Sequence, residues 1–154
     1  MDSYARLWGE CASLLHGLKD LNVRVLETAG VRSEVAGVAV LGRIELLGPV
    51  RLTDLAHALG LDPSSVSRQV TALERSGWVA REKDPSDQRA QRLRLTDKGS
   101  DVVATLRRAR AAALERLTPG WSTQDIDDLT GRVARLNTDI EAHRELLDAT
   151  QETV

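Results

Sequence analysis

The sequence predicts a mainly α-helical fold that carries one small β-hairpin. Three observations support this prediction. Apolar residues follow a heptad spacing near both ends of the chain, which is typical of long amphipathic helices. Two short helical segments joined by a tight turn occupy the middle of the chain, between Thr53 and Gly77. Two short segments of strand-forming residues follow, with a polar loop between them, and this pattern indicates a hairpin.

The composition is that of a globular protein. Of the 154 residues, 42% are hydrophobic and 29% are charged. Aromatic residues make up 3% and Phe is absent, so we expect a core of Leu, Val, Ala and Ile. The N-terminus lacks the pattern of a signal peptide, and no apolar run reaches the roughly 20 residues of a transmembrane helix. The single cysteine excludes an intramolecular disulfide. We therefore expect a cytoplasmic protein that does not associate with membranes.

Charge is distributed unevenly along the chain. The formal net charge is -2 at pH 7. Seven basic and four acidic residues lie between Arg68 and Arg94, whereas three basic and eight acidic residues lie between Thr123 and Val154. A basic centre combined with an acidic C-terminal segment indicates a local binding surface for a polyanion.

Long helices are predicted at both ends of the chain. The first spans about Ser3–Thr28, and the last starts near Thr123. Their heptad positions are Leu7, Cys11, Leu14, Leu18, Leu21 and Val25 in the first helix, and Ile126, Leu129, Val133, Leu136, Ile140, His143 and Leu147 in the last. Two such apolar seams are hard to bury within one small monomer, so we expect them to pair two copies of the chain. Burial in the protein's own core is the alternative.

The helix-turn-helix pattern lies between these ends. Thr53 is the expected N-cap of a short helix, and Gly60 is its expected C-terminal stop. Asp62 is the expected N-cap of the next helix, with Pro63 at the first helical position and Gly77 at its end. Because the second helix has a polar N-terminal half and follows so closely, the pair is typical of a helix-turn-helix.

Two further helices flank this pattern. We expect one from Ser33, its N-cap, to Leu47, and another from the N-cap Thr96 to about Leu117. Between the helix-turn-helix and the second of these, Trp78–Lys83 and Gln91–Leu95 are predicted strands. The intervening residues 84–90 are polar and charged, without an apolar anchor, so we expect a mobile loop, or wing.

The order of these predicted elements resembles the order found in the MarR family of bacterial transcription regulators. The stretch DPSDQRAQRLRLTDKG, Asp84–Gly99, resembles the family's wing signature. The stretch SSVSRQVTALERSGWVAR, Ser64–Arg81, resembles its recognition helix running into the first wing strand. The resemblance covers nearly the whole chain, and both motifs occur in the family's order.

The resemblance implies a winged helix-turn-helix fold flanked by N- and C-terminal dimerisation helices. We expect one MarR-like domain over residues 1–154, in which 33–99 form the winged core and 97–117 a linking helix; residues 3–30 and 118–149 are the expected dimerisation helices. It also implies a homodimer that binds a pseudo-palindromic operator in double-stranded DNA. Such regulators are usually repressors that a small phenolic or drug-like effector releases from DNA.

The recognition helix supplies most of the candidate DNA contacts. Ser64 and Ser65, together with the N–H groups of the helix N-terminus, are suited to hold a phosphate. Thr53 is expected to do the same from the preceding helix. The alternative is that all three hydroxyls only cap helices.

Base contacts are expected one turn further along this helix. Ser67, Arg68 and Gln69 are turned away from its apolar face. An arginine suits guanine O6 and N7, and a glutamine suits adenine N6 and N7. The alternative is a solvated helix face.

The wing supplies the remaining candidates. Arg89 suits a narrow A·T minor groove, although a solvated loop arginine is the alternative. Asp87 is interpreted as an orienting partner for Arg89 or Arg81 through a bidentate pair. Arg92 and Arg94 lie on the outward face of the second strand, where phosphate contact and simple solubility explain them equally well.

Three other features of the sequence bear on function. Cys11 lies where some MarR relatives carry a peroxide-sensing cysteine, so a redox-sensing regulator is one alternative function; a small buried hydrophobe is the competing interpretation. Trp8, His16 and Trp121 are candidates for an effector cavity or for an interface, so the effector pocket is not located. No metal-ligand spacing, nucleophile–base pair or Gly-rich phosphate loop occurs, so we expect no metal, no cofactor and no enzymatic activity. A winged-helix module that binds protein instead of DNA is the other alternative.

Overall fold

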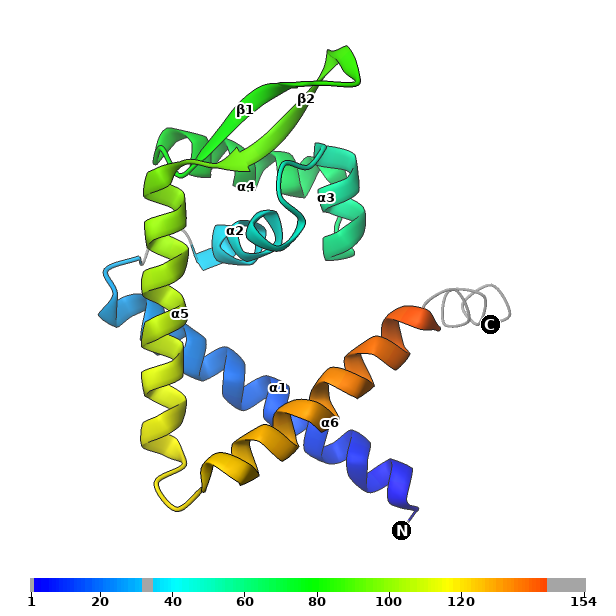
Figure 1. The fold of residues 1–154 in the computed structure, drawn as a ribbon, viewed down its shortest axis with the longest axis vertical. Coiled ribbons are helices and arrows are strands. Elements are labelled where there is room, and N and C mark those ends of the chain that lie inside the picture. Colours follow the sequence, from blue (N-terminus) through cyan, green and yellow to red (C-terminus); the bar gives the residue numbers. More distant parts are fainter. Residues whose placement is uncertain (1, 32–34, 144–154) are drawn as a thin grey trace. The chain divides into compact units, whose positions relative to one another are not determined.

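The computed structural model describes residues 2–31 and 35–143. The elements follow the order α1 (Ser3–Thr28), α2 (Val35–Leu47), α3 (Leu52–Leu59), α4 (Pro63–Arg75), β1 (Val79–Asp84), β2 (Asp87–Leu95), α5 (Asp97–Leu117) and α6 (Thr123–Ala142) (Figure 1). The predicted mainly helical class with one antiparallel hairpin is confirmed. The chain divides into two compact units, Met1–Leu114 and Glu115–Val154, and each is described by itself.

The core of the first unit joins the helix-turn-helix to the hairpin. It is built from aliphatic residues and one tryptophan: Val40, Leu41, Ile44, Val50, Leu55, Ala56, Val66, Val70, Leu73, Trp78, Val79, Leu93 and Val103. These residues come from α2, α3, α4, both strands and the start of α5. A smaller cluster of Leu26, Val38 and Leu106 joins the end of α1 to α2 and α5. The core therefore consists of the predicted Leu, Val, Ala and Ile residues and, beyond the prediction, of Trp78.

Most of the predicted helix ends are confirmed. The Asp62 carboxylate accepts the N–H of Ser65 at 2.8 Å and caps α4, with Pro63 at its first position. Gly60 ends α3 with a left-handed φ of 64°, a conformation that side chains disfavour. The Thr96 hydroxyl accepts the N–H of Gly99 at 3.0 Å at the start of α5. The predicted N-cap Ser33 lies outside the described residues.

The predicted capping role of Thr53 is wrong. Helix α3 begins at Leu52, and Arg51 is its N-cap residue without a side-chain hydrogen bond to the helix. The N–H of Val50 donates to the carbonyl of Leu93, and the N–H of Leu93 donates to the carbonyl of Val50. This bridge holds the chain extended up to Val50, and the helix starts directly after it, two residues earlier than the predicted N-cap Thr53 implies.

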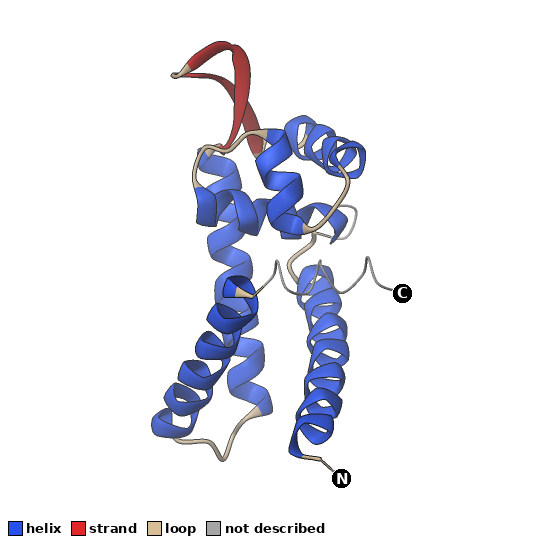
Figure 2. Ribbon diagram, turned by 90° about the vertical axis from the view of Figure 1, so that its right-hand side faces the viewer, coloured by secondary structure: helices blue, strands red, loops and turns tan. Residues whose placement is uncertain are grey.

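The hairpin is longer and tighter than predicted. The strands reach Asp84 and begin again at Asp87, so the turn consists of Pro85 and Ser86 alone (Figure 2). The expected loop over residues 84–90 is therefore mostly strand. The strand register shifts between Lys83, which lies opposite Gln91, and Asp84, which lies opposite Asp87, so residues 88–90 of β2 have no partner in the register. Since residues 84–90 contain no alternating apolar residues, their pattern carried no strand signal.

The predicted apolar seams are largely exposed within their own units. On α1, Leu7, Leu14 and Leu18 are 41–52% exposed, whereas Val25 is buried. On α6, Ile126, Leu129, Val133, Leu136 and Ile140 are 37–48% exposed. His143 is the C-cap of α6, and Leu147 lies outside the described residues. Within the described part of the chain, no helix is long and apolar enough to span a membrane.

Candidate nucleic-acid interface

Helix α4 presents a polar face opposite its buried stripe. Its buried residues Val66, Val70 and Leu73 are spaced four and three apart. Between them, Arg68 is exposed, and Ser67 and Gln69 are half-buried. The orientation predicted for these side chains is therefore present, and it leaves one guanidinium, one amide and several hydroxyls at the surface of the helix.

The serines of the first turn are engaged in the helix cap. The Ser64 hydroxyl donates to Asp62 Oδ1 at 2.5 Å, and the Ser65 N–H donates to the same oxygen. These bonds, led by that of the Ser64 hydroxyl, hold the pKa of the Asp62 carboxyl well below its usual range. A hydroxyl that donates to Asp62 has to rotate before it can donate to a phosphate, so capping and phosphate contact by Ser64 exclude each other.

Arg68 is held over the same turn. Its Nη2 donates to the Ser65 hydroxyl oxygen at 3.2 Å, which is an i, i−3 contact along the helix. Ser65 thus accepts from Arg68 while its N–H satisfies the cap. Thr53 lies in the first turn of α3 and its side chain is exposed.

The wing arginines other than Arg89 form ion pairs. The Arg81 guanidinium forms a two-bond pair with Glu74 of α4, at 2.8 and 3.4 Å. Arg94 pairs with Glu82 at 3.0 Å, and Arg92 Nε lies 3.3 Å from Asp84 Oδ2. These pairs tie the strands to each other and to α4.

The predicted orienting pair of Asp87 with Arg89 or Arg81 is not formed. Asp87 Oδ1 accepts the backbone N–H of Arg89 at 3.0 Å instead. Geometry explains the difference: in the tight hairpin Asp87 stands at the turn, two residues before Arg89, where a carboxylate closes a turn on the backbone. Arg89 itself is exposed.

A buried carboxylate beneath the wing was not predicted. Asp84 is fully buried, and its Oδ2 accepts from Arg51 Nε at 2.7 Å. Its Oδ1 accepts from the N–H and the hydroxyl of Ser86, at 2.8 and 2.7 Å. The Ser86 hydroxyl and the Arg51 guanidinium hold the pKa of the Asp84 carboxyl well below its usual range. Arg51 lies 33 residues away in sequence, so no local pattern pointed to this pair.

The other predicted residues lie away from the wing and α4. Cys11 is half-buried on α1, and Trp8 is exposed there. His16 Nε2, also on α1, lies 3.6 Å from Asp20. Among the residues that the structure describes, no cluster of His, Cys, Asp or Glu is placed to hold a metal ion.

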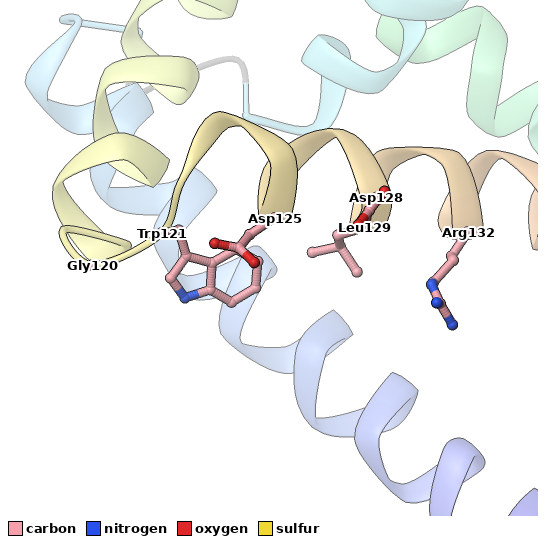
Figure 3. A pocket seen from close by; sticks show the side chains of 6 residues that line it. All are labelled: Gly120, Trp121, Asp125, Asp128, Leu129 and Arg132. Atoms are coloured by element: carbon pink, nitrogen blue, oxygen red, sulfur yellow. The ribbon is translucent and has the colours of Figure 1, made fainter.

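Two of the hollows on the described helices differ in size. One of about 460 Å³ lies over the start of α6 and is lined by Gly120, Trp121, Asp125, Asp128, Leu129 and Arg132 (Figure 3). The predicted effector-cavity residue Trp121 is thus part of a hollow within the second unit. The other, of about 190 Å³, lies between the end of α1 and the start of α5 and is lined by Ala29, Val31, Lys98, Asp101, Val102, Thr105 and Leu106.

Comparison with known proteins finds a matching family profile and similar sequences. The profile of the MarR family matches residues 36–90. The uncharacterized HTH-type transcriptional regulator YxaD of Bacillus subtilis (strain 168) is 31% identical over 104 residues, which cover 68% of this chain and 73% of YxaD.

Two solved structures share the fold. A MarR family protein from Bacillus stearothermophilus matches with a TM-score of 0.79 at 20% identity, covering 92% of this chain and 99% of that one. FabT of Streptococcus pneumoniae, solved in complex with DNA, matches with a TM-score of 0.73 at 20% identity, covering 91% and 99%.

The helix-turn-helix of α3 and α4 with its β-hairpin defines a winged helix-turn-helix protein. Within that class, the family profile and the similarity to YxaD show that the chain belongs to the MarR family of transcriptional regulators.

Proposed function

We propose that the protein is a homodimeric, sequence-specific DNA-binding regulator that represses transcription from a pseudo-palindromic operator in the cytoplasm. In this proposal α4 enters the major groove, with Ser67, Arg68 and Gln69 at the base edges. The wing places Arg89 in the adjacent minor groove. Ser65 and Thr53 contact phosphates at the helix N-termini.

One observation carries the proposal: seven basic and four acidic residues lie between Arg68 and Arg94, and three of those four acids are already paired with arginines. Glu74, Glu82 and Asp84 each pair with a wing or linker arginine, whereas Asp62 and Asp87 accept hydrogen bonds from uncharged groups and keep their charge. The Arg68 guanidinium, by contrast, donates to the neutral hydroxyl of Ser65. Positive charge therefore prevails on the surface that would face the phosphates, in a protein whose net charge is -2.

The test is a binding assay on the DNA upstream of the protein's own gene. Arg68→Ala and Arg89→Ala should each weaken binding by about tenfold, because each removes one groove contact. Arg108→Ala is the matched control, since Arg108 of α5 also donates to a hydroxyl three residues earlier, at 3.2 Å. The residue assignments fail if folded Arg68 and Arg89 variants bind as well as the parent.

Dimerisation is proposed through the exposed seams of α1 and α6. Apolar residues at heptad spacing with more than a third of their surface exposed are costly in a monomer. A twofold partner covers both seams and sets two recognition helices about one helical turn of DNA apart.

Release by a small phenolic or drug-like effector completes the proposal. Ligand sites commonly enclose about 300–1,000 Å³; the hollow beside Trp121 lies in that range at about 460 Å³. A thermal-shift screen of phenolic compounds, repeated with Trp121→Ala, tests both the effector class and this hollow.

The DNA assay also separates the alternatives. A folded protein that binds no genomic fragment supports a protein-interaction module. DNA binding that peroxide abolishes in the parent and not in Cys11→Ser supports the redox-sensing alternative.

A further inference from the structure

We propose that Asp84 is a positioning residue that fixes the wing to the α2–α3 linker and thereby places Arg89 for the minor groove. The inference rests on the proposed DNA binding for its functional part. It concerns a residue that touches no DNA itself and acts through the hairpin.

The Asp84 carboxylate accepts four hydrogen bonds, which come from the distant linker residue Arg51 and from two residues of its own hairpin, Ser86 and Arg92. Oδ2 accepts from Arg51 of the linker at 2.7 Å and lies 3.3 Å from Nε of Arg92 in β2. Oδ1 accepts the N–H and the hydroxyl of Ser86 in the turn. The side chain is fully buried, whereas the two arginines are about 39% and 37% exposed, so the carboxylate is the inner member of the cluster.

The linker is joined to the wing by its backbone as well. Val50 and Leu93 exchange two backbone hydrogen bonds, at 3.0 and 2.8 Å. The next residue, Arg51, is both the N-cap residue of α3 and the partner of Asp84. The wing is therefore connected to the start of the helix-turn-helix at two adjacent linker residues: Val50 joins it at Leu93 in β2, and Arg51 joins it at Asp84, the last residue of β1 before the turn.

A short chain of contacts leads from Asp84 to Arg89. The strand register shifts between Lys83 and Asp84, at the residue whose side chain is buried. Asp84 then closes the turn on Ser86, and Asp87 closes the next step on the N–H of Arg89. The backbone of Arg89 is thus located, bond by bond, relative to the buried carboxylate.

A role in stability alone does not account for this cluster. A buried charge loses its hydration, and well-packed apolar residues often stabilise a protein as much as a buried ion pair does. Beyond any stability, the carboxylate fixes the positions of the linker, the turn and β2 relative to one another, because its four acceptor positions bind all three at once.

The experiment is a double-mutant cycle between Asp84→Asn and Arg89→Ala, measured as DNA affinity. Asparagine keeps the size of the side chain but removes the charge that holds Arg51 and Arg92. We expect Arg89→Ala to weaken binding by about tenfold in the parent and by less than about twofold in the Asp84→Asn background. Equal effects of Arg89→Ala in both backgrounds would overturn the proposal.

Glu82→Gln is the matched control. It removes the same charge from the same hairpin, but from an exposed pair with Arg94. Its effect should be additive with Arg89→Ala. If Asp84→Asn fails to fold, Arg51→Met replaces it, because Arg51 is partly exposed and its loss leaves the Ser86 bonds intact; it should show the same coupling.

Amide hydrogen exchange tests the structural half without DNA. Asp84→Asn should speed exchange at the Arg89 amide by at least about tenfold, because the turn opens more often; Glu82→Gln should not. Unchanged exchange at Arg89 in a folded Asp84→Asn protein contradicts the inference. If the parent protein binds no DNA, the proposed function and the placement of Arg89 in the minor groove are both overturned. The hydrogen-exchange result then decides separately whether Asp84 positions the wing.

Discussion

At the residue scale, Gly99 shows how tightly the hairpin and α5 are packed. A Cβ built on Gly99 would lie 2.0 Å from the carbonyl oxygen of Trp78 and 2.9 Å from its carbonyl carbon. The obstacle is backbone, which cannot move aside as the end of a side chain does. Thr96 fixes the approach further, because its hydroxyl donates to the carbonyl of Gly77 while it accepts the N–H of Gly99.

We expect Gly99→Ala to lower the free energy of unfolding by about 3 kcal/mol, since strain of this kind cannot relax locally. Gly42→Ala is the control, because no atom outside its own helix backbone and chain neighbours lies within 4 Å of a Cβ there. It should raise stability by up to about 1 kcal/mol through helix propensity. Urea unfolding measures both; equal stabilities of the two variants would contradict the packing argument.

The buried carboxylate predicts a dependence of stability on pH. The pKa of Asp84 is lowered in the folded protein, first by the Ser86 hydroxyl and then by Arg51. A lowered folded-state pKa gives stability that is present above the unfolded value of about 3.9 and is lost as pH falls through the folded pKa. The urea concentration at the unfolding midpoint should therefore decrease as the pH is lowered below about 4. The decrease should be less steep in Asp84→Asn than in the parent protein. Asp62 and Asp125 also have lowered pKa values, so part of the slope should remain; identical slopes in the two proteins would refute the role of Asp84.

At the scale of elements, the sequence predicted what depends on neighbouring residues. The cap of α4 by Asp62, the left-handed stop at Gly60 and the buried stripe of α4 each follow from residues within one or two turns. The start of α3 and the length of the strands did not follow, because the bridge at Val50 and the burial of Asp84 depend on partners more than thirty residues away. The missed pairing of Arg81 with Glu74 in preference to Asp87 has a different reason: Glu74 is only seven residues away, but it lies on α4 and Arg81 lies on β1, so their approach depends on how the helix packs against the strand.

The turn between α3 and α4 gives a prediction at this scale. Gly60 has a φ of 64° and its N–H donates to the carbonyl of His57. We expect Gly60→Ala to lower the free energy of unfolding by about 1 kcal/mol and Gly60→Asn by less, because Asn tolerates the left-handed region better. Thermal and urea unfolding of the three proteins check the order, and an alanine variant as stable as the parent would show that the turn adopts another conformation.

At the scale of the whole molecule, the exposed seams predict a dimer. Leu14→Glu on α1 and Val133→Glu on α6 each place a charge among apolar residues that a partner is proposed to cover. Both substitutions should reduce the mass measured by sedimentation from twice 16.8 kDa toward 16.8 kDa. They should also lower the affinity for DNA. Leu46→Glu is the control, because Leu46 is an apolar residue of α2 that is 73% exposed and lies on neither seam. A parent protein that sediments as a monomer, or seam variants that remain dimeric, would contradict dimerisation through these seams.

The whole molecule, of net charge -2, is proposed to bind DNA through a locally basic surface of α4 and the wing. The most direct test is the salt dependence of its affinity for the DNA upstream of its own gene. If several arginines displace counterions from phosphates, the affinity should fall by more than about tenfold between about 50 and 200 mM salt. The slope should be shallower in Arg89→Ala and unchanged in Arg108→Ala. An affinity that does not vary with salt, or no binding at low salt, would contradict the account.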